Sequence, residues 1–104
     1  MIRTVDLVIA GDGSAALAAA VDALKRGRRV LVMLRPGHAR VQRRFRRRLC
    51  RIADVEDGQV AVMTNADIVC VDGVNGVEAV VIRYARTGRL CAVNASAFLS
   101  CEAG

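Results

Sequence analysis

Aromatic residues are nearly absent from this sequence, which has no tryptophan, one tyrosine and two phenylalanines among 104 residues. A surface that stacks nucleic-acid bases needs exposed aromatic rings, and the sequence has few to supply. Only one proline is present and 54% of the residues are hydrophobic, which argues against a disordered chain. The core must therefore consist of valine, alanine, leucine and isoleucine, a composition that favours strands packed against alanine-faced helices.

Metal-site and dithiol motifs are also missing. The four cysteines occur at irregular spacing without a C-x-x-C pair, and a single histidine, His38, accompanies them. This pattern predicts neither a zinc site nor a redox dithiol. Cys70 and Cys91 fall within apolar, strand-like runs, so we expect both to be buried free thiols. His38 follows Pro36-Gly37 and is interpreted as a loop residue.

Long apolar segments are absent as well. The first predicted strand starts almost at once and contains Asp6, which argues against a secretory leader. The longest apolar helix, around residues 15–24, is interrupted by Asp22 and is far too short to span a membrane. The sequence thus predicts no membrane span, a cytoplasmic location and one domain over residues 1–104.

The first half of the sequence has the pattern of a βαβ unit. Val5–Ala10 and Arg29–Leu34 are short apolar runs typical of strands buried on both faces. Between them, Ser14–Arg26 has helical periodicity and is followed by Gly27, a common residue after a helix end. A second helix is predicted over residues 39–52, with an apolar stripe of Val41, Phe45, Leu49 and Ile52.

The second half changes to strand periodicity. Val60–Thr64 is predicted to be a strand, and three strands with short turns follow at 66–72, 77–84 and 89–93. A last apolar run at 97–101 is expected to return to the parallel sheet. The sequence therefore predicts an α/β fold, a Rossmann-like three-layer domain with a parallel sheet and an antiparallel β-meander crossover.

The motif with the clearest chemical meaning is Gly11-x-Gly13-x-x-Ala16, between the first strand and the first helix. In such a turn the first glycine allows a sharp bend, the second leaves room for a pyrophosphate, and the small third residue lets the helix pack closely. The helix N-terminus offers unpaired N–H donors to the phosphates. The candidate binding residues here are Gly11, Asp12, Gly13, Ser14, Ala15 and Ala16. The alternative is a turn kept for packing alone, which the negative charge of Asp12 favours.

Residues 6–33, DLVIAGDGSAALAAAVDALKRGRRVLVM, resemble the opening βαβ unit of FAD/NAD(P)-dependent oxidoreductases with Rossmann-type domains, the group that contains thioredoxin reductase. Residues 76–104, GVEAVVIRYARTGRLCAVNASAFLSCEAG, are similar to the meander and final strand of that group. The resemblance implies an FAD- or NADP(H)-binding module. Family enzymes use a second dinucleotide domain, so it also implies a partner subunit or a homodimer.

Two features depart from the family pattern. Leu34 stands where members usually carry an acid for the adenosine ribose, and Glu102 and Ala103 replace small residues of the terminal turn. Arg35 and Arg40 match two arginines in the NADPH-binding domain of thioredoxin reductase-like members. The planar guanidinium group of arginine suits a ribose 2′-phosphate. Arg35 and Arg40 therefore join the candidate cofactor-binding residues.

The positive charge is concentrated in one segment. Residues 35–51 contain eight arginines and no acid, whereas the rest of the chain has eight Lys/Arg against ten Asp/Glu, a balance of −2. Such a helix suits nucleic acid, an acidic membrane surface or an acidic protein, or it is simply solvated. Nucleic acid is disfavoured because Phe45, the one aromatic in the run, is needed by the apolar stripe. The alternative function is therefore a non-catalytic, degenerate Rossmann-fold interaction domain that uses this helix for an acidic partner.

Overall fold

The computed structural model describes residues 4–11, 13–34, 39–52 and 59–101. The first half forms β1 (Thr4–Ala10), α1 (Ser14–Lys25), β2 (Val30–Met33) and α2 (Ala39–Ile52). The second half forms β3 (Val60–Met63), β4 (Ala66–Asp72), β5 (Ala79–Tyr84) and β6 (Leu90–Ser100). These boundaries lie close to those that periodicity and turn residues predict, apart from the last strand.

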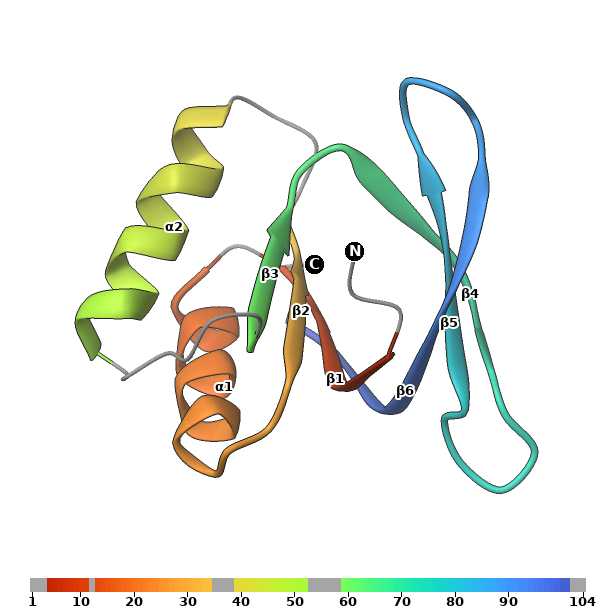
Figure 1. Cartoon of the computed structure of the whole chain (residues 1–104), viewed down its shortest axis with the longest axis horizontal. Helices are drawn as coiled ribbons and strands as arrows, with labels where there is room; N and C mark the ends of the chain where they lie inside the picture. The colour runs from red at the N-terminus through yellow and green to blue at the C-terminus, as the bar shows by residue number, and fades with distance from the viewer. Residues whose placement is uncertain (1–3, 12, 35–38, 53–58, 102–104) are drawn as a thin grey trace.

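The strands form one sheet in the order β3-β2-β1-β6-β5-β4. β3, β2, β1 and the end of β6 run parallel, whereas β4, β5 and the start of β6 form an antiparallel meander. Both helices lie on one side of the parallel strands and the meander lies on the other (Figure 1). This arrangement confirms the predicted α/β fold with three layers.

Two separate cores hold these layers together, because the central strands are apolar on both faces. Along β2, Val30 and Val32 belong to the core beneath the helices, whereas Leu31 and Met33 belong to the core beneath the meander. All four side chains are buried. The uninterrupted apolar run VLVM is thus explained by a strand between two layers.

Helix α1 packs closely on the sheet through small side chains. Ala16, Ala20 and Ala23 recur at helical spacing and are buried against the core that contains Ile9 and Val32. Alanine brings no bulk to this contact, so the helix axis can approach the strands. The helix ends at Lys25, one residue before the predicted end.

Strand β6 corrects the prediction of two separate strands at 89–93 and 97–101. It is continuous over Leu90–Ser100 and changes partner at Asn94, which pairs with β5 on one side and with β1 on the other. The intervening residues Asn94, Ala95 and Ser96 include neither glycine nor proline, and their burial alternates as in a strand. One long strand therefore joins the meander to the parallel sheet.

The edge strand β4 corrects the prediction for Cys70. Its thiol is exposed, whereas Cys91 on β6 is half-buried and packs against the core beneath the meander. The register between β4 and β5 shifts between Ile68 and Cys70. From Val69 to Asp72 every β4 residue is exposed. Apolar sequence alone therefore misplaced Cys70 in the core.

Candidate functional site

The glycine turn lies where β1 leaves the parallel sheet, beside the end of β6. The Gly11 N–H donates to the carbonyl oxygen of Met33 at 3.0 Å, and the Cys101 N–H donates to the carbonyl oxygen of Ala10 at 2.7 Å. Gly11 is buried and has a φ of 141°. A Cβ atom there would lie 2.8 Å from the carbonyl oxygen of Cys101. The fold itself therefore requires glycine at position 11.

Gly13 differs from Gly11 in its backbone angles and in the space around an added Cβ atom. Its φ of −89° and ψ of −171° are extended angles that any residue adopts, so its backbone conformation does not require glycine. Apart from its two neighbours in the sequence, no described residue has an atom within 4 Å of a Cβ built on Gly13. Neither conformation nor packing within the described residues explains the glycine. The space in front of it is of the kind that a close-lying phosphate would use.

The start of α1 offers hydrogen-bond donors to that space. The Leu17 N–H donates to the Gly13 carbonyl oxygen at 3.1 Å and begins the helical ladder, so the preceding N–H groups have no acceptor within the helix. Gly13 provides no side-chain cap, and the first turn contains no acidic residue. Gly13, Ser14 and Ala15 are exposed. These donors and the positive end of the helix dipole therefore face outward at a solvent-accessible turn.

Not every predicted site residue lies at this exposed surface. Ala16 is fully buried and supports the packing of α1 on the sheet. Arg40 is exposed in the first turn of α2. The first turns of both helices lie at the same end of the sheet, toward which the parallel strands point (Figure 1). The predictions for Asp12 and Arg35 lie outside the described residues.

The position of the expected ribose-binding acid is part of the core. Leu34 is 2% exposed and packs with Phe45 and Leu49 beneath the helices. Its N–H donates to the Met63 carbonyl oxygen at 2.8 Å, which extends the ladder between β2 and β3 by one residue. The side chain at position 34 thus stabilises the helix layer and offers no acceptor to a ribose hydroxyl.

Cys101 is a neighbour of the turn that sequence reasoning did not name as a site residue. Its N–H donates to the Ala10 carbonyl oxygen, and its own carbonyl group lies beside Gly11. Its side chain packs on the core beneath the helices. The signal in the sequence is the apolar run AFLSC at 97–101, which predicts a final strand that returns to the parallel sheet. The parallel pairing of β6 with β1 brings that run to the glycine turn.

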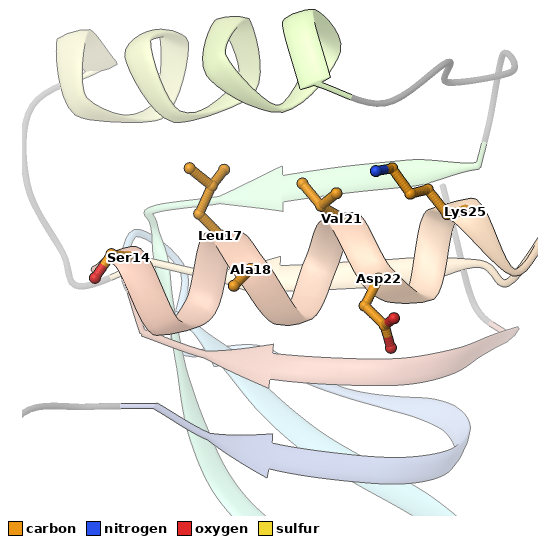
Figure 2. A pocket seen from close by; sticks show the side chains of 6 residues that line it. All are labelled: Ser14, Leu17, Ala18, Val21, Asp22 and Lys25. Carbon is orange, nitrogen blue, oxygen red and sulfur yellow. The ribbon is translucent and has the colours of Figure 1, made fainter.

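A shallow depression of about 350 Å³ runs along the outer face of α1. It is lined by Ser14, Leu17, Ala18, Val21, Asp22 and Lys25. Figure 2 shows Leu17 and Val21 on the side of α1 nearest α2 and Asp22 on the opposite side. The depression meets the glycine turn only at Ser14, so it is not the space in front of Gly13.

Helix α2 buries one face and exposes the other. Phe45 and Leu49 are 6% and 0% exposed and pack in the core beneath the helices, which confirms the predicted apolar stripe at these two positions. The side chains of Val41 and Ile52 lie outside the described set. Gln42 donates from Nε2 to the Val62 carbonyl oxygen at 2.6 Å and so ties α2 to β3. None of the helices in the described ranges is long and apolar enough to cross a bilayer.

Solved structures with the same arrangement of elements include thioredoxin reductases. The enzyme from Streptococcus pyogenes matches with a TM-score of 0.69 and 22% identity over 99% of this chain and 32% of its own. That from Giardia duodenalis matches with a TM-score of 0.70 and 18% identity over 98% of this chain and 32% of its own. The chain has the fold of one domain of thioredoxin reductase-like oxidoreductases.

The same fold occurs in the myxobacterial chondrochloren halogenase, described as a variant of FAD-dependent halogenases. That match has a TM-score of 0.69 and 15% identity over 96% of this chain and 37% of the halogenase. The chain thus spans about a third of the length of these proteins. No protein-family model matches the sequence, and no curated protein does. At these identities the matches show the shared fold, which confirms the resemblance at that level.

Proposed function

We propose that this chain is a dinucleotide-binding module that holds the pyrophosphate of FAD or NADP(H) on residues 11–14 and the start of α1. The observation that carries the proposal is Gly13, whose missing side chain no described part of the protein requires. The shared fold with thioredoxin reductases and an FAD-dependent halogenase supports it. A pyrophosphate placed before Gly13 would accept hydrogen bonds from N–H groups that have no acceptor within the helix.

The described residues of the turn have separate parts in this proposal. Gly11 sets the path of the chain against Cys101, and Gly13 leaves the space that the phosphates enter. The N–H groups of Ser14 and Ala15 bind phosphate oxygens, with the helix dipole adding a favourable charge. Hydride transfer is chemistry that a bound nicotinamide or flavin supplies, while the chain binds and orients the dinucleotide.

Recognition beyond the phosphates depends on arginine in this proposal. Leu34 provides no acceptor for the adenosine ribose, because it is buried in the core. Arg40 lies in the first turn of α2, at the same end of the sheet as the glycine turn, and its exposed guanidinium suits a 2′-phosphate. We therefore favour NADPH over NADH as the nicotinamide ligand, with Arg35 as the second expected contact.

A single domain of this kind supplies one dinucleotide site, so activity would require a second site from another subunit or a second copy. The domain occupies about a third of the oxidoreductases that share its fold. Light scattering on the purified protein, with and without dinucleotide, tests the second-copy alternative. A monomer under both conditions would leave a different subunit as the partner.

Calorimetric titration with FAD, NADPH and NADH tests the proposal. Gly13→Val fits the extended backbone angles at this position and fills the space in front of the turn, so we expect at least a tenfold loss of affinity. Ala18→Val is the matched control, because it adds bulk to an exposed position on α1 more than one turn away. The control should bind as tightly as the wild type. Equal binding by Gly13→Val and the wild type would remove the turn from the site.

The burial of Leu34 favours a second candidate function, a Rossmann-fold interaction domain that has lost its ligand. In that case the glycine turn serves chain packing only, and the core keeps the apolar side chain in place of the ribose-binding acid. The same titrations separate the two candidates. A folded wild type that binds none of the three dinucleotides at millimolar concentration would establish the second candidate over the first.

A further inference from the structure

The exposed face of α2 is strongly basic. It carries seven arginines whose side chains are all exposed, here called the arginine surface: Arg40, Arg43, Arg44, Arg46, Arg47, Arg48 and Arg51. Phe45 and Leu49 lie on the opposite side of the helix and are buried. At 3.6 residues per turn the arginines cover more than half of the helix circumference. The helix is therefore fixed to the protein through one side and presents seven guanidinium groups and the Cys50 thiol on the other.

None of these arginines is paired with a carboxylate among the described residues. The ion pair in the described chain joins Arg26 to Asp22 on α1, at 3.4 Å. Within α2, arginines recur three and four residues apart, and like charges at that spacing destabilise a helix. The arginine side chains of α2 therefore repel one another, and no described acidic residue offsets this repulsion. An anionic partner would remove that repulsion on binding.

The surroundings of the arginines narrow the class of partner. The described apolar stripe of α2 is buried in the core, so it is not available for insertion into a lipid surface. Phe45 is buried too, which leaves no described ring on this helix for stacking bases. The exposed face has no large apolar side chain among those described, whereas permanent interfaces bury such side chains at their centre. These observations favour a transient, charge-steered protein contact.

We propose that the arginine surface is a docking site for an acidic protein surface, with rows of carboxylates as its recognition element. Arg40, Arg44, Arg47 and Arg51 form a row along the outer ridge of α2, about 16 Å long at 1.5 Å per residue. Carboxylates at the same spacing on an acidic helix match this row, and each guanidinium binds a carboxylate in a two-point fork. Arg44, Arg47 and Arg51 remain available to carboxylates when Arg40 contacts a 2′-phosphate, so the proposal holds whether or not a dinucleotide binds at the glycine turn.

Such a contact should form rapidly and weaken steeply with salt, because charge complementarity acts mainly on the rate of encounter. Small, polar interfaces of this type are common between redox proteins and their partners. The acidic partner would therefore meet the protein on the α2 side, away from the meander layer (Figure 1).

Binding of the full chain to poly-L-glutamate tests this inference, at about 50 mM and about 200 mM NaCl. The test variant is Arg44→Gln/Arg47→Gln/Arg51→Gln. The matched control, Arg83→Gln/Arg86→Gln/Arg89→Gln, removes the same charge from exposed positions on and after β5. Thermal melting should be similar for both variants, since all six side chains are exposed. We expect the α2 variant to lose at least tenfold in affinity and the control to stay within about twofold.

Two competing probes make the choice of partner falsifiable. A duplex DNA and vesicles of phosphatidylserine with phosphatidylcholine are titrated under the same conditions. Poly-L-glutamate binding that equals or exceeds both, and that depends on the α2 arginines, supports an acidic protein partner. Stronger binding of the duplex or of the vesicles overturns it in favour of that class. Equal losses in the two arginine variants overturn the docking site itself, because net charge alone would then explain the affinity.

Discussion

Alanine substitution should destabilise the protein at Gly11 and leave its stability almost unchanged at Gly13. At Gly11 the added Cβ would lie 2.8 Å from the Cys101 carbonyl oxygen, on a backbone with a φ of 141°. Holding a non-glycine residue at such angles costs about 1–3 kcal/mol. Displacing the end of β6 to relieve the contact adds about 1–3 kcal/mol, as in other overpacked sites. The lower entropy of the unfolded alanine chain offsets only about 0.4–1 kcal/mol.

Together these contributions predict a loss of about 1–5 kcal/mol. Gly11→Ala should therefore reduce the free energy of unfolding by about 3 kcal/mol, near the middle of this range. For a domain of this size about 1 kcal/mol corresponds to a shift of about 4–8 °C in melting temperature. Gly13→Ala should stay within about 0.5 kcal/mol of the wild type, because two small effects nearly cancel. Alanine is a less favourable N-cap residue than glycine, but it also lowers the conformational entropy of the unfolded chain.

Urea unfolding followed by circular dichroism measures both variants against the wild type. If the fold requires glycine at position 11 but not at position 13, Gly11→Ala loses much stability and Gly13→Ala loses almost none. Similar losses at both positions would refute it, because Gly13 would then be explained by the fold. A neutral Gly11→Ala would show that β6 ends elsewhere than beside the turn.

Three further outcomes follow from the packing and the charges. Phe45→Ala should cost about 3–5 kcal/mol in urea unfolding, whereas Arg47→Ala should stay within about 0.5 kcal/mol, and equal costs would contradict the orientation of α2. Asp6→Ala should cost about 1–2 kcal/mol, because the Asp6 carboxylate accepts a hydrogen bond from the Arg29 N–H at 2.8 Å, and an unchanged midpoint would contradict this. Arg40→Ala should weaken calorimetric binding of NADPH but not of NADH, and parallel losses would place Arg40 away from the 2′-phosphate.

The fold was largely predictable because its signals are local. Strand β2 is a buried apolar run that follows Arg28 and Arg29, and α1 combines helical periodicity with Gly27 shortly after its end. The meander strands are separated by turn residues that include Gly76 and Gly88. The division of the last strand was mispredicted, because whether residues 94–96 turn or continue depends on pairing with β1, which is distant in the sequence.

The candidate site was predictable in position but not in its details. The spacing of Gly11 and Gly13 predicts a site between the first strand and the first helix. That Gly11 is required by packing and Gly13 is not depends on Cys101, which lies against Gly11 but is distant from it in the sequence. The burial of Leu34 likewise depends on Phe45 and Leu49 of α2 packing over it. Exposure of Cys70 depends on β4 being an edge strand, which the order of strands decides.

Amide NMR spectra recorded during titration with FAD and, separately, with NADPH test the central claim most directly, because the claim concerns particular N–H groups. The proposed function predicts that one of the two dinucleotides shifts the Gly13, Ser14 and Ala15 amide resonances more than those of the meander. Gly13→Val should abolish these shifts while its spectrum remains that of a folded protein. Shifts confined to other parts of the protein, or none at millimolar dinucleotide, would contradict phosphate binding at the glycine turn.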